Sequence, residues 1–496
     1  MGKNPSFARN VNKIRKQKAD KAKVGYPRRI PGFFYCFKKV LDKRGKICGE
    51  ALRANTRKEG ELVGWYATDL KRALFSLIDE MEKSPGLFVV NPGKDFTRSR
   101  KLPLSAMLKM MISMGGNSIQ KELFDYHGYH EDTATTSAFI QQREKILPFA
   151  FEFLLHELTA SMAQPLLYRG YRLLGIDGSD LHIPTNPADS LNHIVAQDGS
   201  KGYNLLHLNA LYDLCGKLFL DVVIQNYRDM DEHLALTQLV NRFDIADKAI
   251  LVADRGYESY NNLAHIEEKG WNYVFRIRDH NGLIQGMNLP DVPEFDIQVS
   301  RILTKKQTKM VKASPEKYRF LPSNVRFDFL NLDHDLFYPI SFRVVRFKTA
   351  ENCHQTLITN LDTTMFPIDI LKDIYRLRWG IETSFRELKY AVGLLNFHSK
   401  RAGLIAQEIY AQLIMYNFSM MITSHVIIRQ RLGKHPCQVN FTQAIHICTF
   451  FFRCRNEAPP DADVLIQMCV LPIRPNRSAK RSVRFRSATS FLYRIA

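Results

Sequence analysis

The chain has 496 residues, 45% of them hydrophobic and 24% charged, a composition typical of globular proteins with two to four structural units. Its formal net charge of +20 is uneven: residues 1–60 hold 18 Lys or Arg against 4 Asp or Glu, and residues 473–496 hold 7 against none. Eight cysteines without a C-x-x-C pair exclude a zinc ribbon and argue against a disulfide framework, which favours free thiols in a reducing cytoplasm.

The two basic ends flank a body that is close to neutral, so they indicate binding to a polyanion such as nucleic acid. A solvated basic tail without a partner is the alternative. Residues 1–30 carry few large apolar side chains, and we expect them to be disordered without a ligand. The N-terminus lacks the apolar segment of a secretory signal, although its acid-poor character also fits an organelle transit peptide.

Residues 104–162 have the apolar spacing of helices. The first helix stops at Gly115-Gly116, and a turn-rich break at 125–132 precedes Thr135, a residue type that caps helix starts. The arrangement is compatible with a helix-turn-helix reader of DNA, and an ordinary helical hairpin is the alternative. The polar residues near the start of the second helix are Thr136, Ser137, Gln141 and Arg143.

From residue 171 the pattern changes to strands. Three predicted strands at 172–184, 203–214 and 218–228 come first. A helix at 231–242, a strand at 248–254, a helix at 260–269 and a strand at 272–279 follow. The fourth strand is a continuous apolar run, as expected for burial on both faces. Residues 283–349 contain prolines and short alternating strands with few helix signals, which predicts a mainly β segment.

Pro367 opens a long predicted helix that carries four polar residues at offsets 0, 3, 7 and 14: Tyr375, Arg378, Glu382 and Lys389. At 100° per residue these side chains fall within roughly a 60° arc of one helix face. An acid flanked by cations suits a site that holds a metal ion against a phosphodiester. An exposed helix with ordinary ion pairs is the alternative.

Residues 409–428 have no formal charge, which raises the question of a membrane span. Six polar residues interrupt the run, so we expect a buried helix and no membrane partner.

Two further acids stand out by position. Asp177 lies near the middle of the first predicted strand, and Asp254 ends the buried one, where Gly256 permits a sharp turn. Neighbouring strands would bring Asp177 and Asp254 together, and the helix would lay Glu382 over them. Three hard oxygen ligands select Mg²⁺ or Mn²⁺, and two such ions about 4 Å apart suit phosphoryl transfer. Turn chemistry is the alternative for D-G and D-R-G, and three nearby histidines are interpreted as structural: His182, His207 and His265.

The pieces I-D-G-S at Asp177, A-D-R-G-Y at Asp254 and Y-x-x-R-x-x-x-E-x-x-x-x-x-x-K from Tyr375 to Lys389 resemble the DDE transposases of bacterial insertion sequences. The branch is the one marked by the Y-R-E-K signature, the IS-four group. The resemblance extends from about Phe96 to the C-terminus. It implies an α/β protein with an RNase H-like core, a mainly β insertion between Asp254 and Glu382, and flanking helical regions.

The resemblance implies a role for each matched residue. Asp177, Asp254 and Glu382 would be catalytic and would hold two Mg²⁺ ions, with Mn²⁺ as a substitute. Tyr375, Arg378 and Lys389 would grip the DNA backbone. Trp379 would stack on an unpaired base, with a place in the core as the alternative.

The expected domains follow from these assignments. They are a basic, partly disordered region (1–95), a helical DNA-binding domain (96–168) and the first part of the core (169–282). These are followed by the β-rich insertion (283–349), the second part of the core with the Y-R-E-K helix (350–400), and a helical region with a basic tail (401–496).

The resemblance implies a Mg²⁺-dependent enzyme that cuts double-stranded DNA at the terminal inverted repeats of its element and joins the ends to target DNA. Pairing two ends implies a homodimer on DNA, in the bacterial cytoplasm at the nucleoid. Two alternatives stay open: a catalytically silent DNA-binding relic or inhibitor, and an RNase H-like nuclease without strand transfer.

Overall fold

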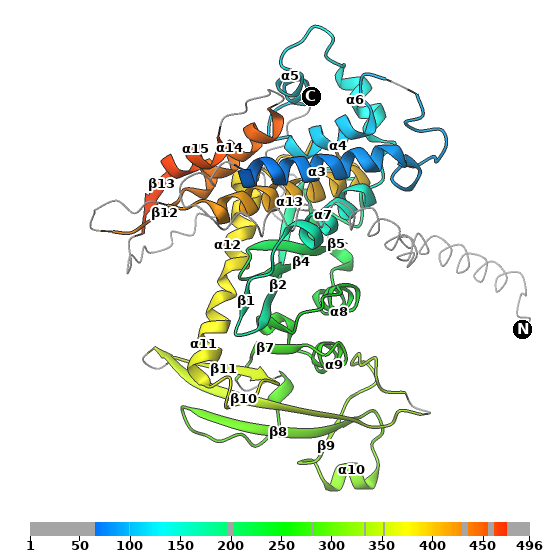
Figure 1. Ribbon diagram of the computed structural model, residues 1–496. Helices are drawn as coiled ribbons and strands as arrows, with labels where there is room; N and C mark the ends of the chain where they lie inside the picture. The colour runs from blue at the N-terminus through cyan, green and yellow to red at the C-terminus, as the bar shows by residue number, and fades with distance from the viewer. Residues whose placement is uncertain are drawn as a thin grey trace, which may run out of the picture. The chain divides into compact units, whose positions relative to one another are not determined.

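The computed structural model describes residues 65–98, 100–195, 202–279, 282–331, 334–350, 353–428, 435–454 and 461–473 (Figure 1). These residues belong to one compact unit that spans 64–496. The basic segment 1–60 and most of the basic tail lie outside the described residues, so the predictions for them stay predictions.

The unit is a mixed α/β structure built on an eleven-stranded sheet with the order β3-β4-β2-β6-β7-β11-β10-β8-β9. Two further strands complete it, because β1 pairs with β2 and β5 pairs with β4. The strands are β1 (Leu167–Tyr168), β2 (Tyr171–Ile183), β3 (His193–Ile194), β4 (Tyr203–Asp213), β5 (Leu218–Asn226), β6 (Ala249–Ala253), β7 (Asn272–Ile277), β8 (Phe295–Thr304), β9 (Tyr318–Phe320), β10 (Tyr338–Ala350) and β11 (Cys353–Thr359).

The first half of the sheet has the predicted order of strands and helices. Strands β2, β4 and β5 form an antiparallel meander. Helix α8 (Glu232–Arg242) then leads to β6, which pairs parallel with β2, and α9 (Tyr260–Glu268) leads to β7, which pairs parallel with β6. All five residues of β6 are buried, which confirms the prediction from its apolar run.

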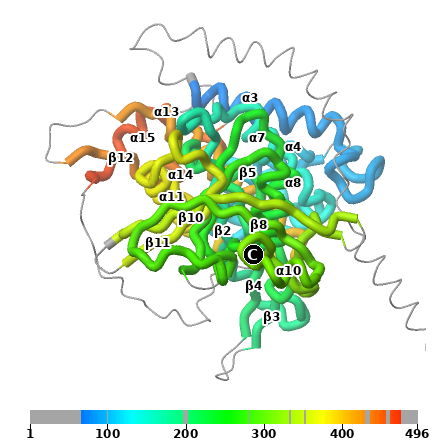
Figure 2. The backbone as a smooth tube through the Cα atoms, turned by 90° about the horizontal axis from the view of Figure 1, so that it is seen from below, coloured from blue at the N-terminus to red at the C-terminus, as the bar shows by residue number. Residues whose placement is uncertain are grey.

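The segment between β7 and β11 extends the same sheet (Figure 2). Strand β10 pairs antiparallel with β8 on one side and with β11 on the other, and β11 pairs antiparallel with β7. One short helix, α10 (Lys309–Ala313), interrupts these strands. The β-rich character predicted for residues 283–349 is therefore confirmed, and its strands are hydrogen-bonded into the core sheet.

Helices gather at the β5 side of the sheet, where α3, α4 and α13 lie side by side (Figure 1). Thr135 caps α6, as predicted, by accepting a hydrogen bond from the Ala138 amide. The sequence analysis did not anticipate α3, although its leucines at helical spacing are buried. The helices are α3 (Trp65–Lys83), α4 (Leu104–Ser113), α5 (Ile119–His127), α6 (Thr136–Arg143), α7 (Phe149–Met162), α13 (Ala402–His425), α14 (Phe441–Arg453) and α15 (Ala462–Met468).

Helix α13 is buried along most of its length and packs against α4, α7 and α14. This confirms the buried helix predicted for the uncharged run. No helix in the described ranges combines the length and apolar character needed to cross a membrane. The last two described strands in chain order, β12 (Cys437–Val439) and β13 (Val470–Pro472), form a separate two-stranded sheet.

A buried ion pair joins α6 to α13. The Arg143 guanidinium lies 2.6 Å from the Glu408 carboxylate and donates further hydrogen bonds to Gln407 and to the Leu404 carbonyl. Both side chains are almost fully buried. The suggestion that Arg143 reads DNA is therefore wrong, because its side chain faces the protein interior.

We expect Glu408→Gln to lower the free energy of unfolding by about 3 kcal/mol, because it leaves the buried Arg143 charge without its counter-ion. Thermal unfolding of the purified chain measures this as a lower midpoint temperature. Glu144→Gln is the matched control, since Glu144 pairs with Arg401 at the surface and should change stability by less than about 0.5 kcal/mol. Equal effects of the two variants would contradict the role assigned to the buried pair.

Candidate active site

Strand pairing places Asp177 and Asp254 at the same edge of the sheet. The parallel register of β2 and β6 runs from Arg172 opposite Ala249 to Gly175 opposite Val252. The same offset, carried two residues beyond the paired residues, would set Asp177 opposite Asp254, and the Asp254 carboxylate is near enough to add to the raised pKa of Asp177. The predicted neighbourhood of these two acids is therefore confirmed.

The helical segment that carries Glu382 differs from the single helix expected. Helix α11 (Ile368–Leu377) is followed by Arg378, which caps it, and α12 (Trp379–Glu387) begins directly after Arg378. The Arg378 amide bonds to the Tyr375 carbonyl, a three-residue step that tightens the turn. A π-helical turn over 388–392 then widens the helix at Lys389. Both irregularities change the rotation per residue, so the prediction of one continuous α-helical face was wrong.

Arg378 connects this helical segment to β2. Its guanidinium lies 2.6 Å from the Glu382 carboxylate and 3.8 Å from the Asp177 carboxylate. The side chain is buried, and its guanidinium also lies over the rings of Tyr375 and Trp379. Glu382 and Asp177, which lie 205 positions apart in the chain, therefore share one cation.

The Asp177 carboxyl has an unusual charge environment. Burial raises its pKa to about 7, Arg378 opposes the shift, and the Asp254 and Glu382 carboxylates add to it. Three acids therefore gather their negative charge around a partly desolvated site. A hard divalent cation fits this donor set, because it would relieve the repulsion that now disfavours the ionised form of Asp177.

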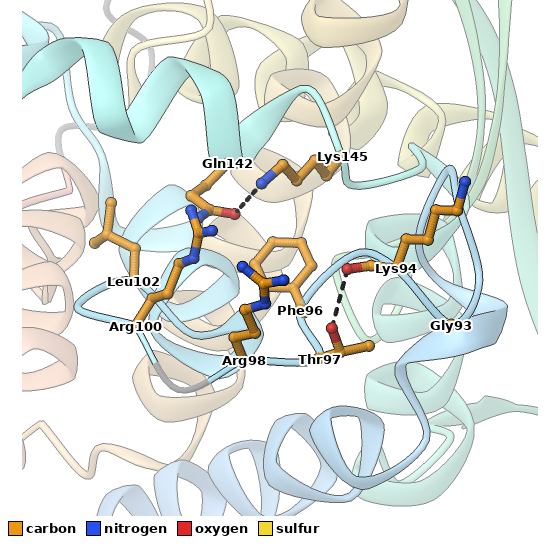
Figure 3. Close-up of a pocket in the computed structure, with 9 residues that line it drawn as sticks. All are labelled: Gly93, Lys94, Phe96, Thr97, Arg98, Arg100, Leu102, Gln142 and Lys145. Carbon is orange, nitrogen blue, oxygen red and sulfur yellow. Dashed lines mark hydrogen bonds between the residues drawn. The ribbon is translucent and has the colours of Figure 1, made fainter.

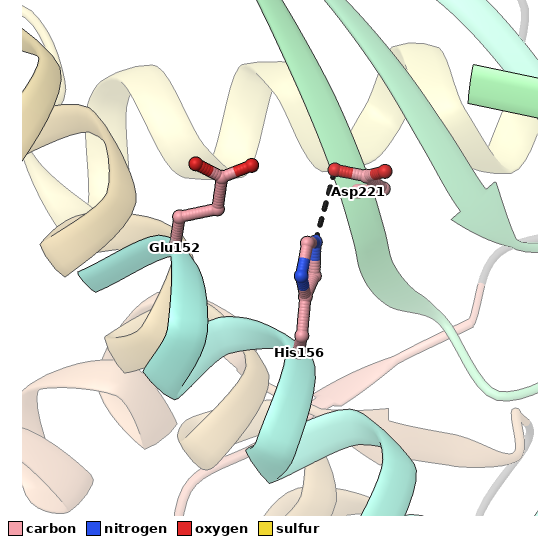
Figure 4. Close-up of side chains that lie close together, drawn as sticks. All are labelled: Glu152, His156 and Asp221. Carbon is pink, nitrogen blue, oxygen red and sulfur yellow. Dashed lines mark hydrogen bonds and ion pairs between the residues drawn. The ribbon is translucent and has the colours of Figure 1, made fainter. Parts of the chain in front are cut away.

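The oxygens of the three acids do not all lie within 4.8 Å of one another. Within the described ranges, the group that meets this distance is Glu152, His156 and Asp221 (Figure 4). There the Asp221 carboxylate already accepts two hydrogen bonds of 2.6 Å from Arg242 and lies 3.0 Å from a ring nitrogen of His156. Burial alone would raise the pKa of Asp221, but these two partners hold it below its ordinary value. This cluster is an ion network between α7, β5 and α8.

Lys389 lies in the last turn of the helical segment and contacts β2 just after Asp177. Its ammonium group donates to the Ser179 hydroxyl at 2.7 Å and to the Asp180 carbonyl at 2.8 Å, both on β2. Burial lowers the pKa of Lys389. Trp379, in contrast, is 57% exposed, so the alternative of a core tryptophan was wrong.

The glycines of the two motifs make room for side chains. Turn chemistry explains D-R-G, because the Asp254 carboxylate accepts a hydrogen bond of 2.7 Å from the Gly256 amide and caps the turn over 255–257. It does not explain D-G, because Gly178 lies inside β2 and has no positive φ. A Cβ on Gly178 would lie 2.5 Å from His207 Nε2 and 2.6 Å from Glu232 Oε1. A Cβ on Gly256 would lie 3.4 Å from Glu232 Oε2. Glu232 therefore lies against both segments that carry the acids.

The sequence analysis missed Glu232 and interpreted His207 as a structural residue. The His207 ring is buried between two carboxylates, with Nδ1 2.7 Å from Asp180 and Nε2 3.2 Å from Glu232. Burial opposes protonation, but these carboxylates outweigh it and raise the pKa of His207 to about 9. No local spacing links the three residues, because they come from β2, β4 and α8.

A comparison with known protein families identifies the family of the chain. The sequence model of the family described as "Transposase DDE domain" matches residues 168–418, half of the chain. The chain belongs to this family of DDE transposases. The matched range includes Asp177, Asp254 and Glu382.

The individual proteins that resemble the chain share less than a third of their residues with it in the aligned regions. The chain is 28% identical over 146 residues to the transposase InsG for insertion sequence element IS4 of Escherichia coli (strain K12). This match covers 27% of the chain and 32% of that relative, so it spans about a third of the relative's length. The cryo-EM structure of the piggyBac transposase synaptic complex with hairpin DNA aligns with a TM-score of 0.38 and 11% identity, over 75% of this chain and 76% of that one.

We expect Gly178→Ala to destabilise the protein by about 1–3 kcal/mol, because the added methyl group would displace the buried His207 ring and the Glu232 carboxylate paired with it. Gly403→Ala is the control: a Cβ there meets nothing within 4 Å, and alanine suits a helix better than glycine. Thermal unfolding of both variants tests the explanation given for the D-G motif. It fails if Gly178→Ala is as stable as the parent chain.

Proposed function

We propose that this chain is a DNA transposase, which cuts double-stranded DNA at the terminal inverted repeats of a mobile element and joins the ends to target DNA. The observation that carries the proposal is that Asp177 and Glu382 share Arg378, and that Asp254 is near enough to Asp177 to add to its raised pKa, in a chain of the DDE family. The meander β2-β4-β5, followed by parallel β6 and β7 with helical crossovers, is the strand order we assign to an RNase H-like core.

Asp177, Asp254 and Glu382 would hold two Mg²⁺ ions, with Mn²⁺ as a substitute. Such ions activate the attacking oxygen and stabilise the leaving one in an in-line phosphoryl transfer. The residues of the chain then have separate tasks. The carboxylates fix the negative charge in the middle of β2, after the end of β6 and on α12, while Arg378 and Lys389 would bind the phosphates next to the bond that breaks.

The exposed ring of Trp379 is placed to stack on an unpaired base, beside the Tyr375 phenol and the Arg378 guanidinium. Arg378 now pairs with Glu382, so its guanidinium becomes available to a DNA phosphate when that carboxylate has another counter-charge.

Two cationic pockets support DNA as the partner. One, of about 250 Å³, adjoins Asp254 and is lined by Arg255, Arg276 and Arg278. The acid among its lining residues, Asp279, accepts a hydrogen bond from Thr356. Arginines that surround a pocket beside the acids suit the phosphates of a bound strand.

The other pocket, of about 270 Å³, lies where the loop before α4 meets the end of α6 (Figure 3). Its lining includes four cations and, in the part that the structure describes, no acid; the cations are Lys94, Arg98, Arg100 and Lys145. Backbone hydrogen bonds between Val90 and Lys145 and between Leu147 and Phe88 fix the loop to α6. This pocket would bind the backbone of double-stranded DNA.

Two protomers would be needed to pair two DNA ends, so the proposal includes a homodimer on DNA, acting at the bacterial nucleoid. A catalytically silent DNA-binding protein and a nuclease without strand transfer are the rival functions. The complete set of acids favours the enzyme over the silent protein.

Glu382→Gln should abolish DNA cleavage while DNA binding survives, because the change removes one anionic metal ligand and retains the shape of the side chain. The assay uses labelled duplexes that carry the ends of the element, with Mg²⁺, and separates joined products from cleaved ends. Asp373→Asn, an exposed acid on α11 that pairs with Arg376, is the control and should cleave normally. Cleavage by Glu382→Gln would overturn the assignment, and cleavage without joined product would favour the nuclease.

Replacing both Arg98 and Arg100 by alanine should weaken DNA binding and reduce the salt dependence of log K by about two units, one for each lost phosphate contact. Binding to a random 30-bp duplex is measured at several salt concentrations without divalent ions. Arg72→Ala is the control, since Arg72 is exposed but pairs with Asp69 on α3. An unchanged slope in the double variant would exclude this pocket as a DNA contact.

A further inference from the structure

We infer that Glu232 supplies a fourth carboxylate to the cation site of Asp177, Asp254 and Glu382, and that His207 positions it. The inference rests on the proposed function, since it concerns the same site. Glu232 is the first residue of α8, directly after Asp231, whose side chain caps the helix by accepting from the Leu234 amide at 2.9 Å.

The two oxygens of Glu232 face different neighbours. Oε1 lies 3.2 Å from His207 Nε2. Oε2 faces the turn after β6: Oε2 and Asp254 Oδ1 both lie within 3.4 Å of the position that a Cβ on Gly256 would take. Oε1 of Glu232 therefore lies beside His207, and Oε2 lies near Asp254, a predicted metal ligand.

A buried phenol connects the segments that carry Asp254 and His207. Tyr257 is 1% exposed, and its hydroxyl donates to Asn209 at 3.0 Å. Its amide donates to the Asp254 carbonyl at 3.2 Å. Because Asn209 lies on β4, the strand that also carries His207, this phenol joins the turn of Asp254 to that strand.

His207 explains how a flexible glutamate is held in this place. Its ring is buried, and its other nitrogen is fixed by Asp180 at 2.7 Å. The imidazole can therefore hold Oε1 in one orientation and leave Oε2 for a cation. A glutamate with a purely structural role would pair with His207 but would not contribute to the affinity of the site for a cation.

The charge requirement gives the test. Glu232→Gln keeps the side-chain length and an oxygen beside His207, but removes the carboxylate. We expect it to weaken Mn²⁺ binding by the full-length chain about tenfold, measured by electron paramagnetic resonance titration without DNA. Asp229→Asn is the matched control: it removes the same charge three residues away at an exposed position and should leave Mn²⁺ affinity within about twofold.

Asp254→Asn separates the failure of this inference from the failure of the proposed function. If Asp254→Asn weakens Mn²⁺ binding and Glu232→Gln does not, Glu232 is only a structural partner of His207 and the inference is wrong. If neither variant weakens it, the cation site itself is wrong. Should Glu232→Gln fail to fold, Glu232→Asp keeps the charge but withdraws it by one methylene; unchanged Mn²⁺ affinity in that variant would likewise overturn the inference.

Discussion

The parallel pairing of β2 with β6 is the constraint on which the site depends. It fixes the offset that sets Asp177 opposite Asp254, and the buried apolar residues of β6 leave little freedom to change that register. A slip of one residue would turn Asp177 to the other face of the sheet. The relative position of Asp177 and Asp254 therefore depends on the hydrophobic packing of β6. The position of Glu382 depends instead on the contacts of α12 with β2.

Gathering carboxylates in a half-buried site costs free energy, and the structure shows what offsets that cost. Arg378 lies between Asp177 and Glu382, and His207 lies between Asp180 and Glu232. Each cation stands between one acid of β2 and one acid of a helix, so the same contacts that balance charge also attach the helices to the sheet. Burial nevertheless raises the pKa of Asp177, the Asp254 and Glu382 carboxylates add to the shift, and an added positive charge there would favour the ionised form.

Local patterns in the sequence predicted much of the fold and part of the site. The apolar run of β6, the Thr135 cap and the strand and helix order around Asp177 and Asp254 depend on neighbours in the chain, and they were read correctly. The tight step at Arg378 and the wide turn at Lys389 have no such signal, because contacts with β2 decide them. Glu232 could not be predicted for the same reason, since only strand pairing brings α8 to the D-G motif.

The strands β8, β10 and β11 have a structural consequence for Glu382. Asp254 and Glu382 are separated by 128 positions, yet the chain returns to β7 through continuous hydrogen bonding from β8 to β10, β11 and β7. Strand β11 ends at Thr359, whose hydroxyl donates to the Tyr273 carbonyl of β7, and α11 begins nine residues later. These strands therefore set the start of the segment that carries Glu382. A change in the pairing of β10 or β11 would move Glu382 relative to Asp177 and Asp254.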